Sequence, residues 1–295
     1  MSRPTLVLID GVAFAPEEAR ISVLDRGFLY GDGVFETLRV YRGVPFALDE
    51  HLDRWLSSAA RLEIALPLPR EALRRELIEA VRRSGLEEAF LRAMLTRGEG
   101  PLGLDVSTLE TPARRVVFVG PVQPPPPEAY ARGVGVVLYR GVRPTDGNVA
   151  EGAKVTNYVV AVLATTQARR AGAHEALLVD ARDRILEGAS SSFFLVRDGV
   201  LITAPESAGV LAGITRAHVL SAARAAGLPC EERAPGPEDL AAADEAFLTS
   251  TIREVLPVVR VGDQVVGAGV PGAVTRRLAS AHAVQVSRYI DEFSD

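Results

Sequence analysis

Lys154, in the stretch AEGAKVTNYVV, is the only lysine among the 33 basic residues of this chain. All the others are arginines, as expected from a GC-rich genome wherever only a solvated positive charge is needed. An arginine guanidinium stays protonated in proteins, whereas a lysine amine can be deprotonated and attack a carbonyl to form a Schiff base. Lys154 is therefore a candidate for covalent chemistry, with a leftover surface lysine as the alternative.

Two motifs on the C-terminal side of Lys154 could bind a charged ligand. Glu187 in ILEGASSSFF follows a short apolar run and precedes a turn of small residues, where the backbone can approach a ligand closely. In LAGITRAHVL, Gly213 leads into Ile214 and Thr215 at a predicted helix start, where amide groups and the helix dipole favour a phosphate. The alternatives are a solvated loop acid and a plain threonine N-cap.

Two further motifs offer donors to anionic oxygens. FLTSTIREVLPVV presents Thr249, Ser250 and Thr251 as hydroxyl donors at the end of a predicted strand, and HLDRWLSSA places Arg54 one helical turn from His51. An arginine fork matches phosphate geometry. Hydroxyl-rich strand ends and surface helix arginines are common, so each motif alone indicates little.

The chain length of 295 residues predicts two domains. Five prolines in seven residues open the segment PVQPPPPEAYARG, which argues against helix or central strand and indicates a stiff extended linker over 121–133. We expect a small N-terminal domain over 1–120 and a larger domain over 134–295.

Strand and helix patterns alternate irregularly with tight hairpins, which predicts an α+β fold rather than a doubly wound parallel sheet. Hairpins are expected around Asp10-Gly11, Arg42-Gly43 and Asp198-Gly199. Helices are expected over 49–62, 70–85, about 157–170, 215–227 and from 271, and further strands over 89–98, 114–120, 133–141, 174–180, 245–250 and 257–267.

Composition excludes several functions. The net charge of −5, with acids and arginines interspersed, gives no argument for nucleic acid or an anionic membrane. Cys230 is the only cysteine and the four histidines lack metal-ligand spacing, so neither a disulfide within the chain nor a metal site is expected. The N-terminal apolar run is too short for a signal peptide, which predicts a cytoplasmic enzyme.

Taken in order, the motifs resemble those of class IV aminotransferases, the fold-type IV pyridoxal phosphate enzymes. The resemblance rests on DRGFLYGDGVFETLRVYRG, HLDRW, AKVTNY, LEGASSSFF, GITR and TSTIREVLPV, which together span nearly the whole chain. The family includes D-amino acid and branched-chain aminotransferases and aminodeoxychorismate lyase. It implies a smaller N-terminal α/β sandwich and a larger C-terminal domain with a β-barrel-like core.

The resemblance also implies roles for individual residues. Lys154 would hold pyridoxal 5'-phosphate as a Schiff base and move the substrate proton, Glu187 would face the pyridine nitrogen, and Tyr158 would bond the 3-oxygen. Residues implied to bind the phosphate end of the cofactor are Arg54, Ile214, Thr215, Ser250 and Thr251.

Substrate-binding positions are implied for Arg26, Tyr30, Phe35 and Arg92. Phe90 stands where branched-chain enzymes often have tyrosine, whereas DRG and FETLR look more like the D-amino acid and lyase branches. TRGEGPLGLD lacks the Arg-x-His carboxylate trap of D-amino acid enzymes, so Arg26 or Arg92 would replace it, and Ser192 stands at the family's usual asparagine. We expect transamination of D-amino acids, with branched-chain L-amino acids and then lyase activity as alternatives, and a cofactor-free scaffold as the non-enzymatic one.

The same resemblance implies assembly. The stretch that contains Arg26 and Tyr30 reaches, in the family, into the active site of the neighbouring subunit. The sequence therefore predicts a homodimer with composite active sites.

Overall fold

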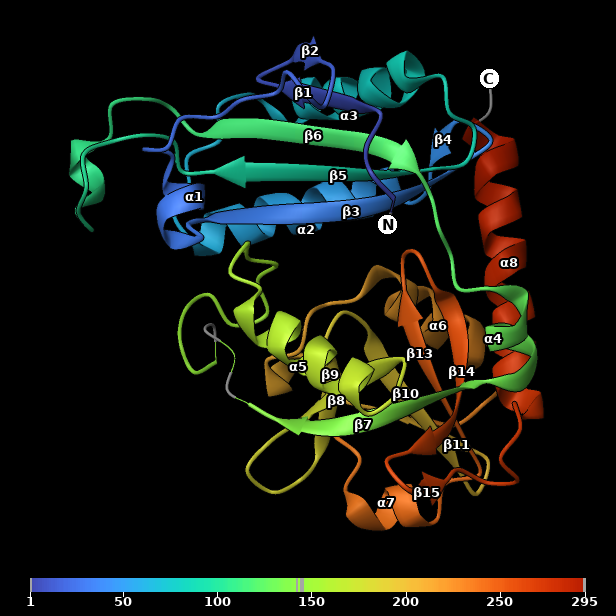
Figure 1. The fold of residues 1–295 in the computed structure, drawn as a ribbon. Helices are drawn as coiled ribbons and strands as arrows, with labels where there is room; N and C mark the ends of the chain where they lie inside the picture. Colours follow the sequence, from blue (N-terminus) through green and yellow to red (C-terminus); the bar gives the residue numbers. More distant parts are fainter. Residues whose placement is uncertain (1, 142, 144–145, 294–295) are drawn as a thin grey trace. The chain divides into compact units, whose positions relative to one another are not determined.

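A computed structural model describes residues 2–141, 143 and 146–293 (Figure 1). The chain forms two compact units. The first unit contains Met1–Gln123, Asn148–Asn157 and Arg288–Asp295, and the second contains Pro124–Gly147 and Tyr158–Ser287. Two segments that the sequence analysis assigned to the C-terminal domain thus belong to the first unit, and one of them carries Lys154.

The first unit is built on a six-stranded antiparallel sheet of order β2-β1-β6-β5-β3-β4. The predicted hairpins at Asp10-Gly11 and Arg42-Gly43 are confirmed, and all four turn residues have positive φ, as a two-residue hairpin requires. The strands are β1 (Leu6–Ile9), β2 (Val12–Phe14), β3 (Gly33–Tyr41), β4 (Val44–Pro45), β5 (Ala89–Thr96) and β6 (Arg114–Pro121).

Helices α2 (Leu48–Arg61) and α3 (Arg70–Ser84), both predicted, cover one face of this sheet. Trp55 of α2 and Leu77 of α3 belong to the same buried cluster as Leu38 of β3. Because side chains alternate along a strand, every second residue of β3 points away from these helices. The short helix α1 (Arg26–Tyr30) and the 3₁₀ turn η1 (Val106–Thr108) were not predicted.

The second unit contains a nine-stranded mixed sheet of order β12-β11-β10-β13-β14-β7-β8-β9, with β15 paired to β14. Strand β7 runs parallel to β8 and β14, while β9 at the end of the order also lies beside β10. The sheet therefore curls into a half-barrel, as expected. Its strands are β7 (Val134–Arg140), β8 (Glu175–Val179), β9 (Ile185–Gly188), β10 (Ser192–Arg197), β11 (Val200–Thr203), β12 (Cys230–Glu232), β13 (Glu245–Ser250), β14 (Glu254–Val261) and β15 (Gln264–Val265).

Helices pack on separate parts of this sheet. Helix α5 (Val159–Arg170) packs against β8, whereas α6 (Ile214–Ala225) and α8 (Ala273–Phe293) contribute Leu220 and Leu278 to a cluster around the stacked rings of Phe194 and Phe247. The short elements are α4 (Pro127–Arg132), η2 (Glu206–Ala208) and α7 (Pro237–Ala241).

The proline-rich segment departs from its prediction. Helix was excluded over 121–133, yet α4 begins at Pro127, with Pro126 extended before it. Proline is tolerated at the first helical position, because the N–H that it lacks has no partner inside the helix. The number of prolines therefore did not exclude a helix in this segment. The last proline, Pro127, instead marks the first residue of the helix.

No described helix is long and apolar enough to cross a membrane. Within the described ranges, no group of His, Cys, Asp and Glu side chains could hold a metal ion.

Candidate functional site

The backbone around Lys154 is fixed to the first unit by three hydrogen bonds. The amide of Phe35 donates to the Lys154 carbonyl at 2.9 Å, and that of Thr156 donates to Gly33 at 2.9 Å. The Lys154 amide donates to Ser58 Oγ on α2 at 3.1 Å. The lysine therefore sits on a short strand-like segment beside the start of β3.

The Lys154 side chain contacts Phe35, a predicted substrate residue whose ring also contacts Arg92. Its Nζ lies 4.6 Å from the ring centroid of Phe35, and the Arg92 guanidinium carbon lies 4.4 Å from the same centroid. The Phe35 side chain is buried, and Arg92 Nε also donates to Thr37 Oγ1 at 3.4 Å. One aromatic ring thus holds a primary amine and a guanidinium by cation–π contacts.

Arg54 forms a bidentate ion pair that sequence reasoning missed. Its Nε and Nη2 donate to the two carboxylate oxygens of Glu36 at 2.6 and 2.8 Å. His51 Nδ1 lies 2.8 Å from Glu36 Oε2, and the side chains of Glu36 and His51 are each only 1% exposed. Glu36 lies on the face of β3 that α2 covers, so this ion pair fixes the orientation of Arg54.

The surroundings lower the pKa of both Glu36 and His51. Burial alone would raise the pKa of Glu36, but Arg54 and His51 outweigh it and hold that pKa well below its usual value. Burial lowers the pKa of His51. The imidazole is therefore neutral at pH 7, and its Nδ1–H donates to the carboxylate, which can only accept.

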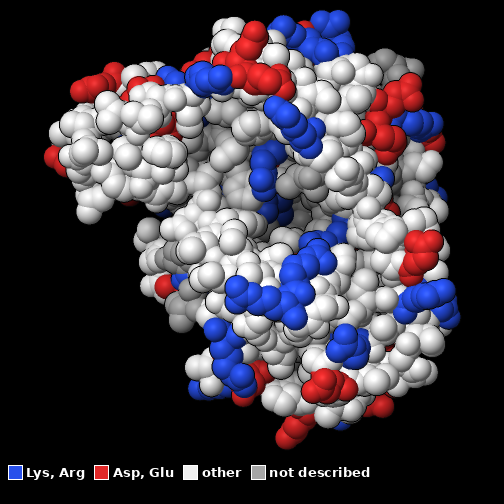
Figure 2. Space-filling model, in the orientation of Figure 1, with Lys and Arg blue, Asp and Glu red and all other residues white. Residues whose placement is uncertain are grey.

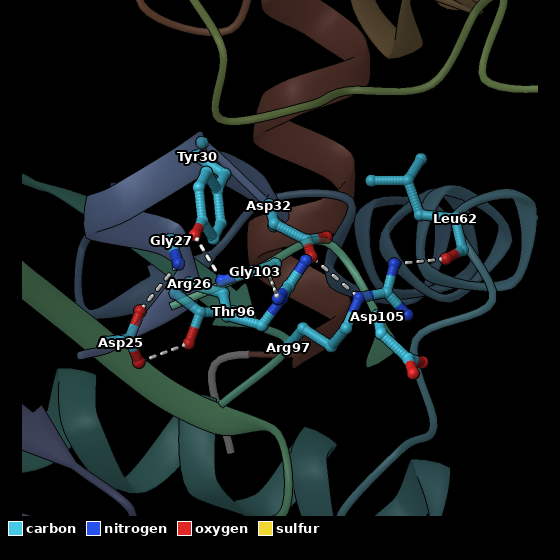
Figure 3. A network of polar contacts seen from close by, with 12 residues as sticks. Asp25, Arg26, Gly27, Tyr30, Asp32, Leu62, Thr96, Arg97, Gly103 and Asp105 are labelled. Atoms are coloured by element: carbon cyan, nitrogen blue, oxygen red, sulfur yellow. Dashed lines mark hydrogen bonds and ion pairs between the residues drawn. The ribbon is translucent and has the colours of Figure 1, made fainter. Parts of the chain in front are cut away.

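Arg26 and Tyr30 belong to a different network (Figure 3). Arg26 is buried, and its Nε and Nη1 donate to Asp32 Oδ2 at 2.9 Å and to the Gly103 carbonyl at 2.8 Å. Tyr30 Oη accepts from the Gly103 amide at 3.0 Å. Arg97 donates to the same Asp32 oxygen at 2.8 Å and to the Leu62 carbonyl at 2.6 Å. Arg26 and Tyr30 thus hold the loop between β5 and β6 rather than meeting Lys154 and Arg92.

Glu187, in the second unit, lies on β9 as the small-residue turn begins. Arg143 Nη1 forms an ion pair with its Oε1, and the Leu211 amide donates to its Oε2 at 3.2 Å. Arg143 is also bound to Asp146, with Nε and Oδ1 2.7 Å apart. The sequence analysis missed Arg143, because this residue lies outside all of the motifs that it identified.

Helix α6 begins with an uncapped N-terminus. Gly213 is its N-cap residue and supplies no side chain, so the threonine-cap alternative for Thr215 is wrong. A Cβ on Gly213 would lie 2.7 Å from Ser192 Oγ, and Ser192 pairs in register with Thr249. Thr249 Oγ1 is buried and has no hydrogen-bond partner among the described residues. The start of α6 therefore lies beside Ser192 of β10, whose register partner on β13 is Thr249.

The remaining predicted residues lie at element ends in the second unit. Ser250 ends β13 and Thr251 follows it, both partly exposed, while Ile214 and Thr215 form the buried first turn of α6. Tyr158 precedes α5 as its N-cap residue. The predicted site residues are therefore divided between the units, with Arg26, Tyr30, Phe35, Arg54, Arg92 and Lys154 in the first.

The described residues thus include one lysine amine, a helix start without a side-chain cap and a carboxylate paired with Arg143, which are residue types suited to a cofactor. Residues 33–261 match the family described as amino-transferase class IV, and the chain belongs to this family of pyridoxal phosphate-dependent transaminases.

Two relatives match the sequence of this chain over almost their whole lengths. A putative branched-chain-amino-acid aminotransferase of Methanocaldococcus jannaschii is 36% identical over 272 residues, which cover 92% of this chain and 93% of that protein. A D-alanine aminotransferase of Bacillus licheniformis is 34% identical over 276 residues, 93% of this chain and 95% of the other.

Solved structures confirm the fold-type IV architecture. The Escherichia coli branched-chain amino acid aminotransferase matches 96% of this chain and 95% of its own with a TM-score of 0.89 and 28% identity. The T.th. branched-chain amino acid aminotransferase, solved with pyridoxamine 5'-phosphate, matches 99% of this chain and 97% of its own with a TM-score of 0.89 and 32% identity.

The described residues fit the cofactor of this family, pyridoxal 5'-phosphate. Lys154 supplies the only side-chain primary amine, and the start of α6 has amide donors that suit a phosphate. The Thr249 hydroxyl is a further buried donor without a hydrogen-bond partner among the described residues. Glu187 supplies a carboxylate already oriented by the Leu211 amide.

Replacing Lys154 tests the covalent role. Lys154→Arg retains the positive charge but not the chemistry, so we expect transamination to fall at least about 1,000-fold in both Lys154→Ala and Lys154→Arg. Borohydride reduction of the native protein, followed by peptide mass spectrometry, should locate the cofactor on the peptide that contains Lys154. Sustained turnover by Lys154→Arg would disprove the assignment.

Replacing Glu36 tests the buried ion pair. We expect Glu36→Gln to lower the free energy of unfolding by about 3 kcal/mol at pH 7, because it leaves Arg54 without its buried partner. A depressed pKa means that the carboxylate's stabilisation is present above its ordinary pKa of 4.5 and is lost as the pH falls below that value. Urea titrations of both proteins should therefore show a gap that narrows below pH 4.5, and a constant gap would contradict the ionised pair.

Proposed function

We propose that this enzyme transaminates D-amino acids and 2-oxo acids, with Lys154 as the catalytic residue and Arg92 as the residue that binds the substrate carboxylate. The observation that carries this proposal is the ring of Phe35, which contacts the Lys154 amine and the Arg92 guanidinium together. The amino and carboxylate groups of an α-amino acid share one carbon, so an enzyme must hold the groups that recognise them at a fixed separation.

Arg92 is a better carboxylate partner than Arg26. The Arg26 guanidinium is buried and already donates to Asp32 and to a backbone carbonyl, so binding a substrate would require breaking an ion pair. Arg92 is half-buried on the sheet face away from α2 and α3, where its planar fork can form paired hydrogen bonds with a carboxylate.

The preference for D-amino acids rests on the DRG and FETLR sequences and on the D-alanine aminotransferases among the relatives. Branched-chain L-amino acids are the alternative, favoured by one feature of the loop between β5 and β6. Leu102 and Leu104 are 74% and 80% exposed there, where an Arg-x-His trap would otherwise carry charge. An apolar loop suits an apolar substrate side chain.

The cofactor roles follow the positions described above. When bound, pyridoxal 5'-phosphate withdraws electrons from the substrate Cα. Glu187 keeps the pyridine nitrogen protonated, and Tyr158 bonds the 3-oxygen. The phosphate is bound by Arg54, Ile214, Thr215, Ser250 and Thr251.

Lys154 has two tasks in this proposal. Its amine would hold the cofactor as a Schiff base before the substrate arrives. Once free, the same amine would accept the proton from the substrate Cα and act as the acid that donates it again on the other side of the substrate nitrogen. A second 2-oxo acid reverses these steps, which gives ping-pong kinetics. A cytoplasmic location stays a prediction.

The enzyme is a homodimer in which α1 and the loop between β5 and β6 of one copy complete the active site of the other. Phe28 on α1 is 66% exposed, and Leu102 and Leu104 are more exposed still. The surface over this loop, at the left of Figure 2, consists mostly of uncharged atoms. Exposed apolar patches mark interaction surfaces, and the Arg26 and Arg97 ion pairs hold this one in shape.

A half-reaction panel tests the substrate. D-alanine and D-glutamate should bleach the cofactor's absorbance band faster than their L-enantiomers and than L-leucine. Arg92→Gln should lower kcat/KM about 10- to 100-fold for the preferred substrate, because a charged hydrogen-bonding partner is lost. A faster reaction with L-leucine would establish the branched-chain alternative, and an unchanged kcat/KM in Arg92→Gln would remove Arg92 from substrate binding.

The dimer is tested by placing charge on the apolar loop. The double variant Leu102→Asp, Leu104→Asp should sediment as a monomer and lose most of its activity, since a charge cannot be buried unpaired in an interface. Val12→Asp is the matched control, because Val12 is 59% exposed on β2 and should leave the dimer intact. A monomeric variant with full activity would show that one chain contains the whole site.

A further inference from the structure

Glu175, the first residue of β8, is a buried carboxylate that no motif marks. Its side chain is only 2% exposed. Oε1 accepts from the Ser190 amide at 2.6 Å and from Ser190 Oγ at 3.0 Å, while Oε2 accepts from Ser191 Oγ at 3.0 Å. Arg253 Nη1 lies 3.2 Å from Oε2. A buried charge is tolerated only when it is paired and hydrogen-bonded, and Glu175 meets both conditions.

Arg253 connects this carboxylate to a second turn. Its guanidinium donates to Ser190 Oγ through Nη1 and Nη2 at 3.1 and 3.2 Å. Its own amide donates to Ser250 Oγ at 3.4 Å, and its carbonyl accepts from Tyr130 Oη at 3.2 Å. The turn between β13 and β14 is therefore bonded to the turn between β9 and β10.

Gly188 shows how closely these groups pack. A Cβ there would lie 2.2 Å from Ser191 Oγ and 3.1 Å from Glu175 Oε1. Its φ is not in the left-handed region, so the glycine is needed for space rather than for backbone conformation. Glu187 precedes this glycine directly, so the carboxylate of Glu175 lies against the residue that sets the backbone position of Glu187.

We propose that Glu175 is a positioning residue that fixes the distance between the two ends of the cofactor site in the second unit. The proposal rests on the functions proposed above for Glu187 at the pyridine nitrogen and for Ser250 and Thr251 at the phosphate. Glu175 holds the first of these turns directly and the second through Arg253. A rigid cofactor ring is bound tightly only if both turns keep their spacing, so Glu175 acts on binding without touching the cofactor.

The test is cofactor affinity, measured apart from catalysis. Apo protein is titrated with pyridoxal 5'-phosphate, following absorbance and the circular dichroism of the bound cofactor, and the melting temperature of each apo protein is recorded. We expect Glu175→Gln to weaken binding about ten-fold or more, a loss comparable to that seen for outer partners of metal ligands. The dichroic band should also shrink at saturation, because the ring is held less firmly.

Glu245→Gln is the matched control. Glu245 accepts from the Val274 and Thr275 amides at 3.0 and 2.7 Å at the start of α8, and it touches neither turn. It should lower the melting temperature while leaving the dissociation constant within about two-fold. If Glu175→Gln changes affinity no more than this control, Glu175 is merely structural and the proposal is overturned.

Arg253→Gln provides an independent variant if Glu175→Gln fails to fold. It should also weaken cofactor binding about ten-fold, and an unchanged affinity would overturn the proposal equally. If the proposed function itself is wrong, the result differs from this one, because the native protein would then not bind pyridoxal 5'-phosphate through Lys154 in the same titration.

Discussion

Two backbone hydrogen bonds between the start of β3 and residues 154–156 fix the position of Lys154, the residue that we propose to be catalytic. Lys154 is separated from β3 by more than a hundred residues, yet its segment adds to that strand and its side chain reaches the ring of Phe35. The amine of a lysine on a mobile loop would occupy many positions, because both the backbone and the side-chain torsions would vary. Here the backbone is fixed on both sides, so only the side-chain torsions remain to be ordered.

Most elements could be predicted from the sequence because their signals are local. Asp10-Gly11 and Arg42-Gly43 specify hairpins through positive φ, and the apolar repeat of α2 specifies its buried face. The missed elements are short, such as α1, whose five residues are stabilised by the Asp25 cap and by packing of Gly27 on Thr96. The return of residues 148–157 to the first unit was also missed, because pairing with β3 leaves no periodic pattern in so short a segment.

The site residues also differ in whether local sequence motifs or contacts with distant residues determine their roles. Phe35, Arg92 and Lys154 were named from motifs and lie together. Arg26 was named from its motif too, but its partner Asp32 and the Gly103 carbonyl make it part of a loop scaffold. The buried positions of Glu36 and Glu175 could not be predicted, because a glutamate in a strand pattern indicates a solvent-facing position until the covering helix or turn is known. The partners that pair with a buried carboxylate are distant in sequence.

The buried pairs also constrain how a dianionic cofactor can be bound. Arg54 is already neutralised by Glu36 and Arg253 by Glu175, so neither presents an unbalanced charge. In the proposed site, Arg54 would therefore add little net positive charge, because Glu36 already takes its Nε and Nη2 hydrogen bonds. Neutral donors would then supply much of the affinity for the phosphate, and the amides at the start of α6 and the Thr249 hydroxyl are suited to this role. Such donors would select a phosphate by hydrogen-bond geometry and would not require a positively charged chain, which agrees with the net charge of −5.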